Sequence, residues 1–480
     1  MQPTASRRRP LVAALALSPL LASVAAFADP VTHVVTTCND ALFLPVCNGS
    51  DDGTLRQAFA CAQDGDNIDL TQLQCSTISL STGAILIGVA DLTLQGPGDH
   101  RLALAGFDDY GSSLLYDLGG GTLTIDGLDL TFGSKYRSDN IARGGCVYTN
   151  GNLKVNGSHV SFCGVHANTY TAAGGALYAY GSAEITNSVI DTAGLTTSGY
   201  ARGGCVFAHG DVTLAYSSLS GCRNATSSHG FGGGLYVGGE LIMKYSTIRD
   251  NENDDGEVGI GGGIYARGET FVFWSTISGN SATAGGGIAL MNDSNGHTAS
   301  IIESTISGNV AHAAGGIAAN IPLAISNSTI AFNTANVPDT QPIGYAWSGG
   351  LAVRASPVTI TSTIVANNLA HHSDGRDERS DIGGDIPNDV GGSTSLVVDS
   401  AQAVPPDTIF ADPLLAPLAG NGGPTETHAL GAGSPAIDAG DDGGWDTDQR
   451  GTGYPRIQNA RADIGAYEVD PDLIFRNGFD

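Results

Sequence analysis

Two stretches of the chain are nearly identical: "RGGCVYTNGNLKVNGSHVSFCG" at residues 143–164 and "RGGCVFAHGDVTLAYSSLSGCR" at residues 202–223. Both copies begin with Arg-Gly-Gly-Cys, and both hold two cysteines at the same spacing. Repetition at a period of tens of residues is typical of folds in which one small unit is stacked many times. The repeat therefore decides the fold before any single motif is considered.

The same unit recurs through the middle of the chain. Each unit has a glycine pair followed by an aliphatic residue, and these aliphatic anchors are Val147, Leu177, Val206, Leu235, Ile264, Ile288, Ile317 and Leu351. The usual step is about 29 residues, with one shorter step before Ile288 and one longer step before Leu351. A Ser-x-aliphatic triplet follows each anchor and ends at Val160, Ile190, Leu219, Ile248, Ile277, Ile306, Ile330 or Ile364. The step from anchor to triplet is the same in every unit except that of Ile288, and Leu115 and Leu128 repeat it earlier in the chain.

Within a unit, apolar residues occupy every second position, as in "GGALYAYGSAEITNSVI". This alternation predicts short β-strands and no helix. A unit of about 29 residues cannot close a core alone, but turns stacked at about 4.8 Å share one interior. Because parallel connections are nearly always right-handed, we predict an all-β fold, a right-handed parallel β-helix (β-solenoid), with a short N-terminal capping helix.

The two cysteines of a unit predict a disulfide inside one turn. Cys146 and Cys205 stand just before the anchor, and Cys163 and Cys222 stand shortly after the triplet. The intervening unit has alanine in both positions, so we expect the pairs Cys146–Cys163 and Cys205–Cys222. Later units place asparagine in the second position, which predicts a ladder of side chains from Asn251, Asn280, Asn309, Asn333 and Asn367.

The first residues have the pattern of a secretory signal peptide at 1–28: three arginines, an apolar run and the small-residue site Ala26-Phe27-Ala28. Eight cysteines in an exported chain predict four disulfides formed in an oxidising compartment. Removing the three arginines changes the formal charge from −27 to −30, which argues against nucleic acid as a partner. No later segment has eighteen uncharged apolar residues, so a membrane-spanning helix is not expected.

Two caps are predicted at the ends of a β-helix that covers residues 76–400. The N-terminal cap, residues 29–75, contains a helix in "DDGTLRQAFACAQDGD" with Thr54 or Asp52 as its N-cap. Cys38, Cys47, Cys61 and Cys75 would fix this cap through one of three connectivities, of which 38–47 with 61–75 is the most local. Residues 401–469 would form irregular C-terminal turns, followed by a tail at 470–480.

The C-terminal turns contain acids and arginines for which two interpretations are open. An ion-pair network would order the turns through Asp438, Asp448, Arg450, Arg456 and Asp463. The alternative is a Ca²⁺ site built from Asp438, Asp441, Asp446 and Asp448. No other cofactor is expected.

One acidic loop is the only candidate for catalysis. It places Glu252, Asp254, Asp255 and Glu257 between Arg249 and Arg267, where carboxylates could bind Ca²⁺ or orient a sugar. The alternative is a solvated acidic loop. A second candidate is a set of aromatic residues in the variable loops, which would form a stacking platform or cover apolar strands: His166, Tyr170, Tyr200, His229, Phe231, Tyr345 and Trp347.

The motifs also carry a family resemblance. The pairing of "GGGIYA" with "ISGN" resembles the repeats of polymorphic outer-membrane proteins, and "DPLLAPLAGNGGPTETHALGAGSPAID", "TDQRG" and "ADIGAYE" are similar to the choice-of-anchor Q domain. The fold resembles that of pectin-lyase-like β-helices. The final "DLIFRNGFD" resembles a short tail of some secreted proteins, so an address tag and a plain last strand are both open.

The resemblance implies an exported protein at the cell surface or in the medium, with the periplasm as another location. We therefore expect a non-catalytic, adhesin-like binding module whose partner is a polysaccharide or a surface protein. The alternative is a polysaccharide lyase or glycoside hydrolase, because the fold also supports such enzymes.

Overall fold

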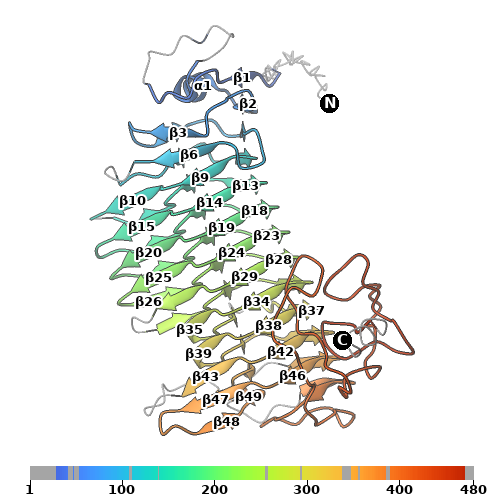
Figure 1. The fold of residues 1–480 in the computed structure, drawn as a ribbon. Coiled ribbons are helices and arrows are strands. Elements are labelled where there is room, and N and C mark those ends of the chain that lie inside the picture. The colour runs from blue at the N-terminus through green and yellow to red at the C-terminus, as the bar shows by residue number, and fades with distance from the viewer. Residues whose placement is uncertain are drawn as a thin grey trace, which may run out of the picture.

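The chain forms a right-handed parallel β-solenoid of about 11 turns, as predicted (Figure 1). The computed structural model describes residues 29–41, 47, 53–107, 111–138, 140–254, 258–291, 295–337, 347–354, 357–384 and 390–470. Within these residues there are one helix and four long sheets, and every strand pair is parallel except one.

The 11-stranded sheet carries the aliphatic anchors of the repeat. Its strands are β4 (Ile85–Ile87), β7 (Leu115–Asp117), β12 (Val147–Thr149), β17 (Leu177–Ala179), β22 (Val206–Ala208), β27 (Leu235–Val237), β32 (Ile264–Ala266), β36 (Ile288–Leu290), β40 (Ile317–Ala319), β44 (Leu351–Val353) and β49 (Ile382–Gly384). Val147 pairs with Leu177, and Ile317 pairs with Leu351 across the longest step, so the predicted anchors share one register. All eight are buried in the core.

The 13-stranded sheet follows the anchors in each turn. It contains β1 (Thr32–Val34), β2 (Asp66–Asp69), β5 (Leu92–Gln95), β8 (Thr122–Asp126), β13 (Asn152–Asn156), β18 (Ala183–Thr186), β23 (Val212–Ala215), β28 (Leu241–Lys244), β33 (Thr270–Phe273), β37 (Ala299–Ile302), β41 (Leu323–Ser326), β45 (Val358–Thr361) and β50 (Val390–Ser393). Leu153 and Val155 of β13 are buried, while Asn152 and Lys154 are exposed, as expected for strands with one face on a core.

The 12-stranded sheet carries the triplets. It contains β3 (Thr77–Leu80), β6 (Ala103–Gly106), β9 (Asp129–Thr131), β14 (His159–Ser161), β19 (Val189–Asp191), β24 (Ser218–Ser220), β29 (Thr247–Arg249), β34 (Thr276–Ser278), β38 (Thr305–Ser307), β42 (Thr329–Ala331), β46 (Ile364–Ala366) and β51 (Leu396–Val397). The serine of each triplet bonds the next turn, as when the Ser188 N–H donates to Ser217 Oγ at 3.1 Å.

Two triplet predictions are wrong by one or two positions. Val160 pairs with Leu130, so Leu128 does not fill the triplet position of its turn. Ile330 pairs with Val365, so Ile364 points outward and lies in a separate cluster under the C-terminal segment. In both turns another residue occupies the position of the triplet serine. The Leu128 N–H donates to Ser158 Oγ, and the Thr363 N–H donates to Ser395 Oγ. These two turns have one or two more residues between the anchor and the triplet than the usual turn, so a constant spacing misplaces the triplet.

The 15-stranded sheet has two arms. The first arm contains β10 (Ser134–Arg137), β15 (Gly164–Ala167), β20 (Gly194–Thr197), β25 (Arg223–Thr226) and β30 (Glu252–Asp254), and the returning arm contains β11 (Ala142–Arg143), β16 (Ala172–Ala173), β21 (Ala201–Arg202), β26 (His229–Phe231) and β31 (Val258–Ile260). A small core separates them, made of Ala142, Val165, Ala167, Ala172, Leu195 and Ala201.

The arms merge in the shortest turn. β35 (Ser281–Ala284) pairs with both β30 and β31, so this turn lacks the loop that separates the arms elsewhere. The sheet continues through β39 (Val310–Ala313), β43 (Thr334–Val337) and β47 (Leu369–His372) to β48 (Asp377–Arg379), which is antiparallel to β47.

Disulfides and an asparagine ladder occupy the same corner of successive turns. Cys146 bonds Cys163 and Cys205 bonds Cys222, as predicted, with Cα–Cα distances of 5.5 and 5.4 Å. In the following turns Asn251 Nδ2 donates to Asn280 Oδ1 at 2.9 Å, and the pattern continues through Asn309 and Asn333. The last amide is Asn368, not Asn367, because this turn is shifted by one position; it donates to Asp381 Oδ1 at 2.8 Å.

The N-terminal cap contains the predicted helix, α1 (Leu55–Cys61). Thr54 is its N-cap, and its hydroxyl accepts a hydrogen bond from the Gln57 N–H; Asp52 lies outside the described residues. The cysteines form Cys38–Cys75 and Cys47–Cys61, so the most local connectivity is wrong. Cys75 lies beside β3, and its bond to Cys38 joins the cap to the first turn of the solenoid.

The C-terminal residues pack against the outer face of the 12-stranded sheet. Figure 1 shows this irregular segment in red beside β37, β42 and β46. Thr305 Oγ1 donates to Gln449 Oε1 at 2.6 Å, and the Ala466 N–H donates to Thr329 Oγ1 at 3.1 Å. We call residues 414–469 the docked segment.

Candidate functional site

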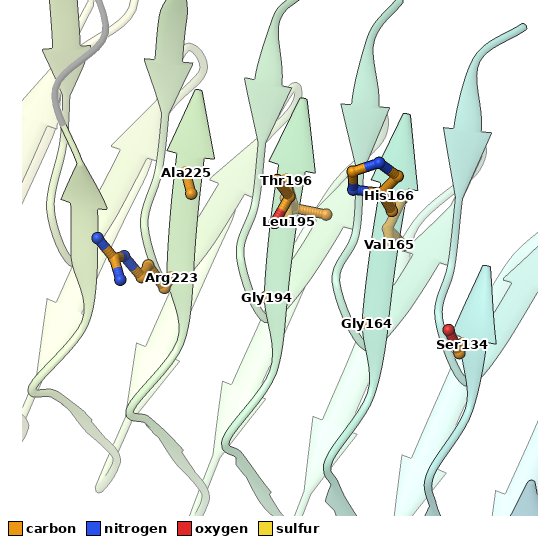
Figure 2. A pocket seen from close by; sticks show the side chains of 9 residues that line it. All are labelled: Ser134, Gly164, Val165, His166, Gly194, Leu195, Thr196, Arg223 and Ala225. Atoms are coloured by element: carbon orange, nitrogen blue, oxygen red, sulfur yellow. The ribbon is translucent and has the colours of Figure 1, made fainter. Parts of the chain in front are cut away.

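The outer face of the first arm contains an open hollow of about 340 Å³, which we call the upstream hollow (Figure 2). The first and third residues of each strand in this arm point outward, and they come into register every turn. The hollow is lined by Ser134, Gly164, Val165, His166, Gly194, Leu195, Thr196, Arg223 and Ala225. Four successive turns therefore contribute to one surface.

A stacked aromatic pair stands at one end of this hollow. The rings of Tyr136 and His166 are 5.3 Å apart and 10° from parallel. Asn168 holds both: its Nδ2 donates to the Tyr136 hydroxyl at 3.3 Å, and its Oδ1 lies 3.1 Å from His166 Nε2. In the next turns the same position holds the small residues Thr196 and Ala225, so the aromatic stack stops at His166.

Two glycines form the floor of the hollow. Gly164 and Gly194 occupy the first position of β15 and β20, and neither has a positive φ. A Cβ added at Gly164 would meet no atom within 4 Å, and one added at Gly194 would meet only the Arg223 carbonyl oxygen, at 3.3 Å. By contrast, Gly144 has φ +61°, and its Cβ would lie 2.2 Å from the Val147 carbonyl oxygen. The fold requires Gly144, but neither its backbone conformation nor its surroundings require glycine at position 164.

A charged pair closes the other end. Arg223 Nε lies 3.2 Å from Glu252 Oε2, and both side chains are about half exposed. Beyond Glu252 a second hollow of about 160 Å³ continues on the same sheet, which we call the downstream hollow. It is lined by Glu252, Asn253, Ser281, Ala282, Val310, Ala311, His312 and Asn336. The two hollows are thus in line along the solenoid axis.

The residues of the predicted acidic site are divided between different sheets. Glu252 lies in the first arm and pairs with Arg223, whereas Arg249 lies on β29 of the 12-stranded sheet and pairs with Asp250 at 3.2 Å. Arg267 follows β32, in the 11-stranded sheet. Asp255 and Glu257 lie outside the described residues, as does the side chain of Asp254. Sequence reasoning had not identified Arg223 as the partner of Glu252, although it occupies the equivalent position one turn earlier.

Of the residues predicted for the aromatic platform, the structure brings Tyr200, His229 and Phe231 into contact. Tyr170 and Tyr200 are 48% and 45% exposed in the loops that join the two arms, while His166 belongs to the upstream hollow. Phe231 is half-buried and contacts Tyr265 edge-to-face, with ring centres 5.1 Å apart; His229 packs on Tyr200 at 5.6 Å. Trp347 is half-buried, and Tyr345 lies outside the described residues.

Sequence reasoning missed a continuous aromatic row on the 11-stranded sheet. It contains Tyr116, Tyr148, Tyr178, Phe207, Tyr236 and Tyr265, whose neighbouring rings are 4.5–5.2 Å apart. The returning arm packs over it, with Arg143 lying 5.1 Å from the Tyr178 ring centre. The row ends at Ala289, one turn after the arms separate for the last time. The sequence does contain the pattern that predicts this row, because each aromatic residue directly follows an aliphatic anchor.

Among the acids and arginines of the docked segment considered for an ion-pair network, Asp448 and Arg450 form an ion pair, and the others bond to different partners. Arg450 Nη2 lies 2.6 Å from Asp448 Oδ2, and its guanidinium is sandwiched between the rings of Tyr454 and Tyr467. Arg456 Nε lies 3.1 Å from Glu303 Oε1, in ion-pair contact without hydrogen-bond geometry, and this pair joins the segment to the solenoid. Asp463 Oδ1 accepts from the Asp438 N–H at 2.8 Å.

Several carboxyl groups of this region have raised pKa values. Burial raises the pKa of Glu468 to about 7, although the N–H groups of Asp463 and Gln458 donate to it. Burial also raises the pKa of Glu303 well above its usual range, against the effect of Arg456. The four acids considered for Ca²⁺ are not brought together: Asp448 binds Arg450, and within the described residues no group of three acids, histidines or cysteines has a metal-binding arrangement.

An apolar hollow of about 410 Å³ lies where the docked segment meets the solenoid. Ser307 Oγ and His428 Nε2 are 2.8 Å apart in its wall, and His428 Nδ1 is 2.7 Å from the Ala416 carbonyl oxygen. Both side chains are almost fully buried, and burial lowers the pKa of His428. The pair fastens the segment to β38.

No protein-family model and no curated protein matches this sequence. The structure thus establishes a parallel β-helix with four disulfides, which indicates an oxidising environment. Within the described residues, no helix is long and apolar enough to cross a membrane.

Proposed function

We propose that this protein is an exported, non-catalytic β-helix that binds a glycan along the outer face of its 15-stranded sheet. The observation that carries the proposal is the pair of open hollows in line on that face, of which the upstream one is bounded by stacked rings and has two glycines in its floor. Ligand sites combine a concave surface with a few fixed polar groups, and Asn168 and Arg223 supply such groups here.

Three further observations support export. The signal-peptide pattern at residues 1–28, which lie outside the described part of the chain, fits passage across a membrane. Four disulfides fit an oxidising destination. The resemblance of the repeats to polymorphic outer-membrane proteins, and of residues 401–469 to the choice-of-anchor Q domain, favours the cell surface or the medium. An adhesin-like role follows from this location.

One observation favours the alternative, a polysaccharide lyase or hydrolase. Arg223 and Glu252 meet at 3.2 Å in the open groove between the two hollows, where a basic and an acidic side chain could act on a bound chain. A hydrolase would need a second carboxylate facing Glu252 across the sugar. Among the described side chains, Glu252 pairs with the Arg223 guanidinium.

The test exposes the purified protein to a panel of polysaccharides, with Ca²⁺ or with a chelator, and records both retention and newly formed chain ends. Retention without new ends is the expected result. New chain ends would replace the binding function with the enzymatic one. A protein partner would be the remaining explanation if no polysaccharide is retained, and the glycan proposal would then be wrong.

A further inference from the structure

The upstream hollow lacks a ring at the place where its aromatic stack would continue. Tyr136 and His166 stack at 5.3 Å, close to the spacing between turns, and the next rung is Thr196. Tyr136 stacks with His166 from the preceding turn, and Thr196 occupies the equivalent position one turn further on; Figure 2 shows His166 and Thr196 in neighbouring strands. In the aromatic row of the 11-stranded sheet, by contrast, each successive turn as far as Tyr265 adds a stacked ring.

The floor beneath that missing rung is bare backbone. Gly164 and Gly194 lie side by side in neighbouring strands, and a Cβ at Gly164 would meet nothing. Neither conformation nor packing therefore explains Gly164, whereas a Cβ at Gly194 would contact the Arg223 carbonyl oxygen tightly. Glycine where the fold does not need it lets another molecule approach the backbone closely.

The polar groups around the missing rung are held in place. Asn168 fixes the ring planes of Tyr136 and His166, and Glu252 orients the Arg223 guanidinium at the far end. Fixed partners reduce the ordering cost of binding. A flat ligand with an apolar face fits this arrangement: the face would lie on His166, and the Arg223–Glu252 pair bounds the far end of the hollow.

We propose that the upstream hollow is a subsite for one pyranose ring of a glycan, which stacks on His166 as the next rung of the Tyr136–His166 column and lies over Gly164 and Gly194. This inference rests on the proposed glycan-binding function and locates one of its binding sites. A pyranose presents C–H groups on its face, which the electron-rich face of a ring attracts, and hydroxyl groups on its edge. The volume of about 340 Å³ lies near the lower end of small-ligand sites, which span roughly 300–1,000 Å³.

Two variants test the subsite, each with the full chain. Gly164→Val fills the floor with a β-branched side chain that suits a strand, and His166→Ala removes the stacking face. The control is Thr213→Val, at an outward position of β23 on the 13-stranded sheet. Dissociation constants are measured calorimetrically for cellohexaose, xylohexaose, mannohexaose, chitohexaose and hexagalacturonate, and thermal unfolding confirms that each variant is folded.

The expected result is that at least one hexaose binds the unmodified protein and Thr213→Val equally, and that its dissociation constant rises at least tenfold in both hollow variants. In NMR titrations the His166 ring protons should shift with the same sugar. Unchanged binding in both variants would overturn the subsite and leave the glycan proposal standing, as would retention of a polymer with no hexaose bound. If neither hexaoses nor polymers bind, both proposals are wrong.

Discussion

At the scale of single residues, the asparagine ladder uses the full bonding capacity of each amide. Asn309 Nδ2 donates to Asn333 Oδ1 at 2.9 Å and to the Ile277 carbonyl oxygen at 3.0 Å, while its Oδ1 accepts from the Asn280 backbone and side chain. The side chain is fully buried. A buried polar group that loses its partner bears its full desolvation cost, so each rung depends on the next.

Asn309→Ala should therefore lower the free energy of unfolding by about 2–4 kcal/mol, because it leaves neighbouring donors and acceptors unpaired in the core. Urea unfolding followed by circular dichroism measures the change. Asn336→Ala is the matched control, since Asn336 is exposed, and its effect should stay within about 0.5 kcal/mol. Equal effects of the two variants would contradict the ladder's role.

Sequence alone predicted most of this ladder but misplaced its last amide. The corner positions of Asn251 to Asn333 follow from the spacing of Cys163 and Cys222, because disulfide and amide fill equivalent positions. Asn367 and Asn368 are adjacent, and nothing in the residue types shows which one points inward. Only the pairing of Ile330 with Val365 decides it.

At the scale of elements, the returning arm and the aromatic row stabilise each other. Tyr178 is 3% exposed, stacks on Tyr148 and Phe207, and lies beneath Arg143. Where the arms merge at β35, the row gives way to Ala289, Ala318 and Ala352. The large side chains are thus confined to the turns in which a second arm covers them.

Tyr178→Ala should cost about 3–5 kcal/mol, the range for removing a buried aromatic side chain. Tyr180, on the same turn, is 54% exposed and stacks only on His209 among the described residues, at 5.2 Å. Tyr180→Ala should cost less than about 1 kcal/mol. Chemical unfolding of the two variants gives the comparison, and a small loss for Tyr178→Ala would show that the arm does not depend on the row.

The arms were beyond sequence reasoning for a physical reason. Alternation identified strands that bury one face on the main core, but the strand formed by Ala172 and Ala173 is too short, and its side chains too small, to show a period. The burial of these alanines depends on Val165 and Leu195, which lie in a stretch whose sequence predicts a loop. The upstream hollow could not be predicted for the same reason, since the open space beside Gly164 depends on the positions of its neighbours in the fold.

At the scale of the whole molecule, the docked segment joins a second cluster of buried residues to the solenoid. Ile364 and Leu396 from the sheet pack with Leu430, Ala436 and Ile464 from the segment. Buried carboxyl groups at the same junction, Glu303, Asp463 and Glu468, all have raised pKa values, chiefly because of burial. The stability of this junction should consequently depend on pH.

The sign follows from Glu468, whose pKa is about 7 in the folded protein against an ordinary value of 4.5. The contribution of Glu468 to the free energy of unfolding is at most about 3 kcal/mol. It is fully present below about pH 4.5 and is lost as the pH rises through about 7. Stability should fall between pH 5 and pH 8, and Glu468→Gln should remove much of that fall. Urea unfolding followed by tryptophan fluorescence reports on docking, because Trp445 contacts Trp274 with ring centres 5.2 Å apart.

Glu184→Gln is the control for this experiment, since Glu184 is an exposed carboxyl that pairs with Lys154 on the 13-stranded sheet. It should leave the pH dependence of the fluorescence transition unchanged. A pH dependence that survives in Glu468→Gln would assign the effect to Glu303 or Asp463 instead.

The positions of the four disulfides also imply that the two halves of the solenoid respond differently to a pulling force. All of them lie between Cys38 and Cys222, whereas the later turns are joined by amide side chains and backbone bonds. Under a pulling force, the residues inside the disulfide loops 146–163 and 205–222 cannot extend, so these two turns release only the rest of their length. The downstream turns yield their full length once the docked segment detaches. A turn that opens upstream would therefore release less chain than a turn that opens downstream, so the same extension requires more upstream turns to open.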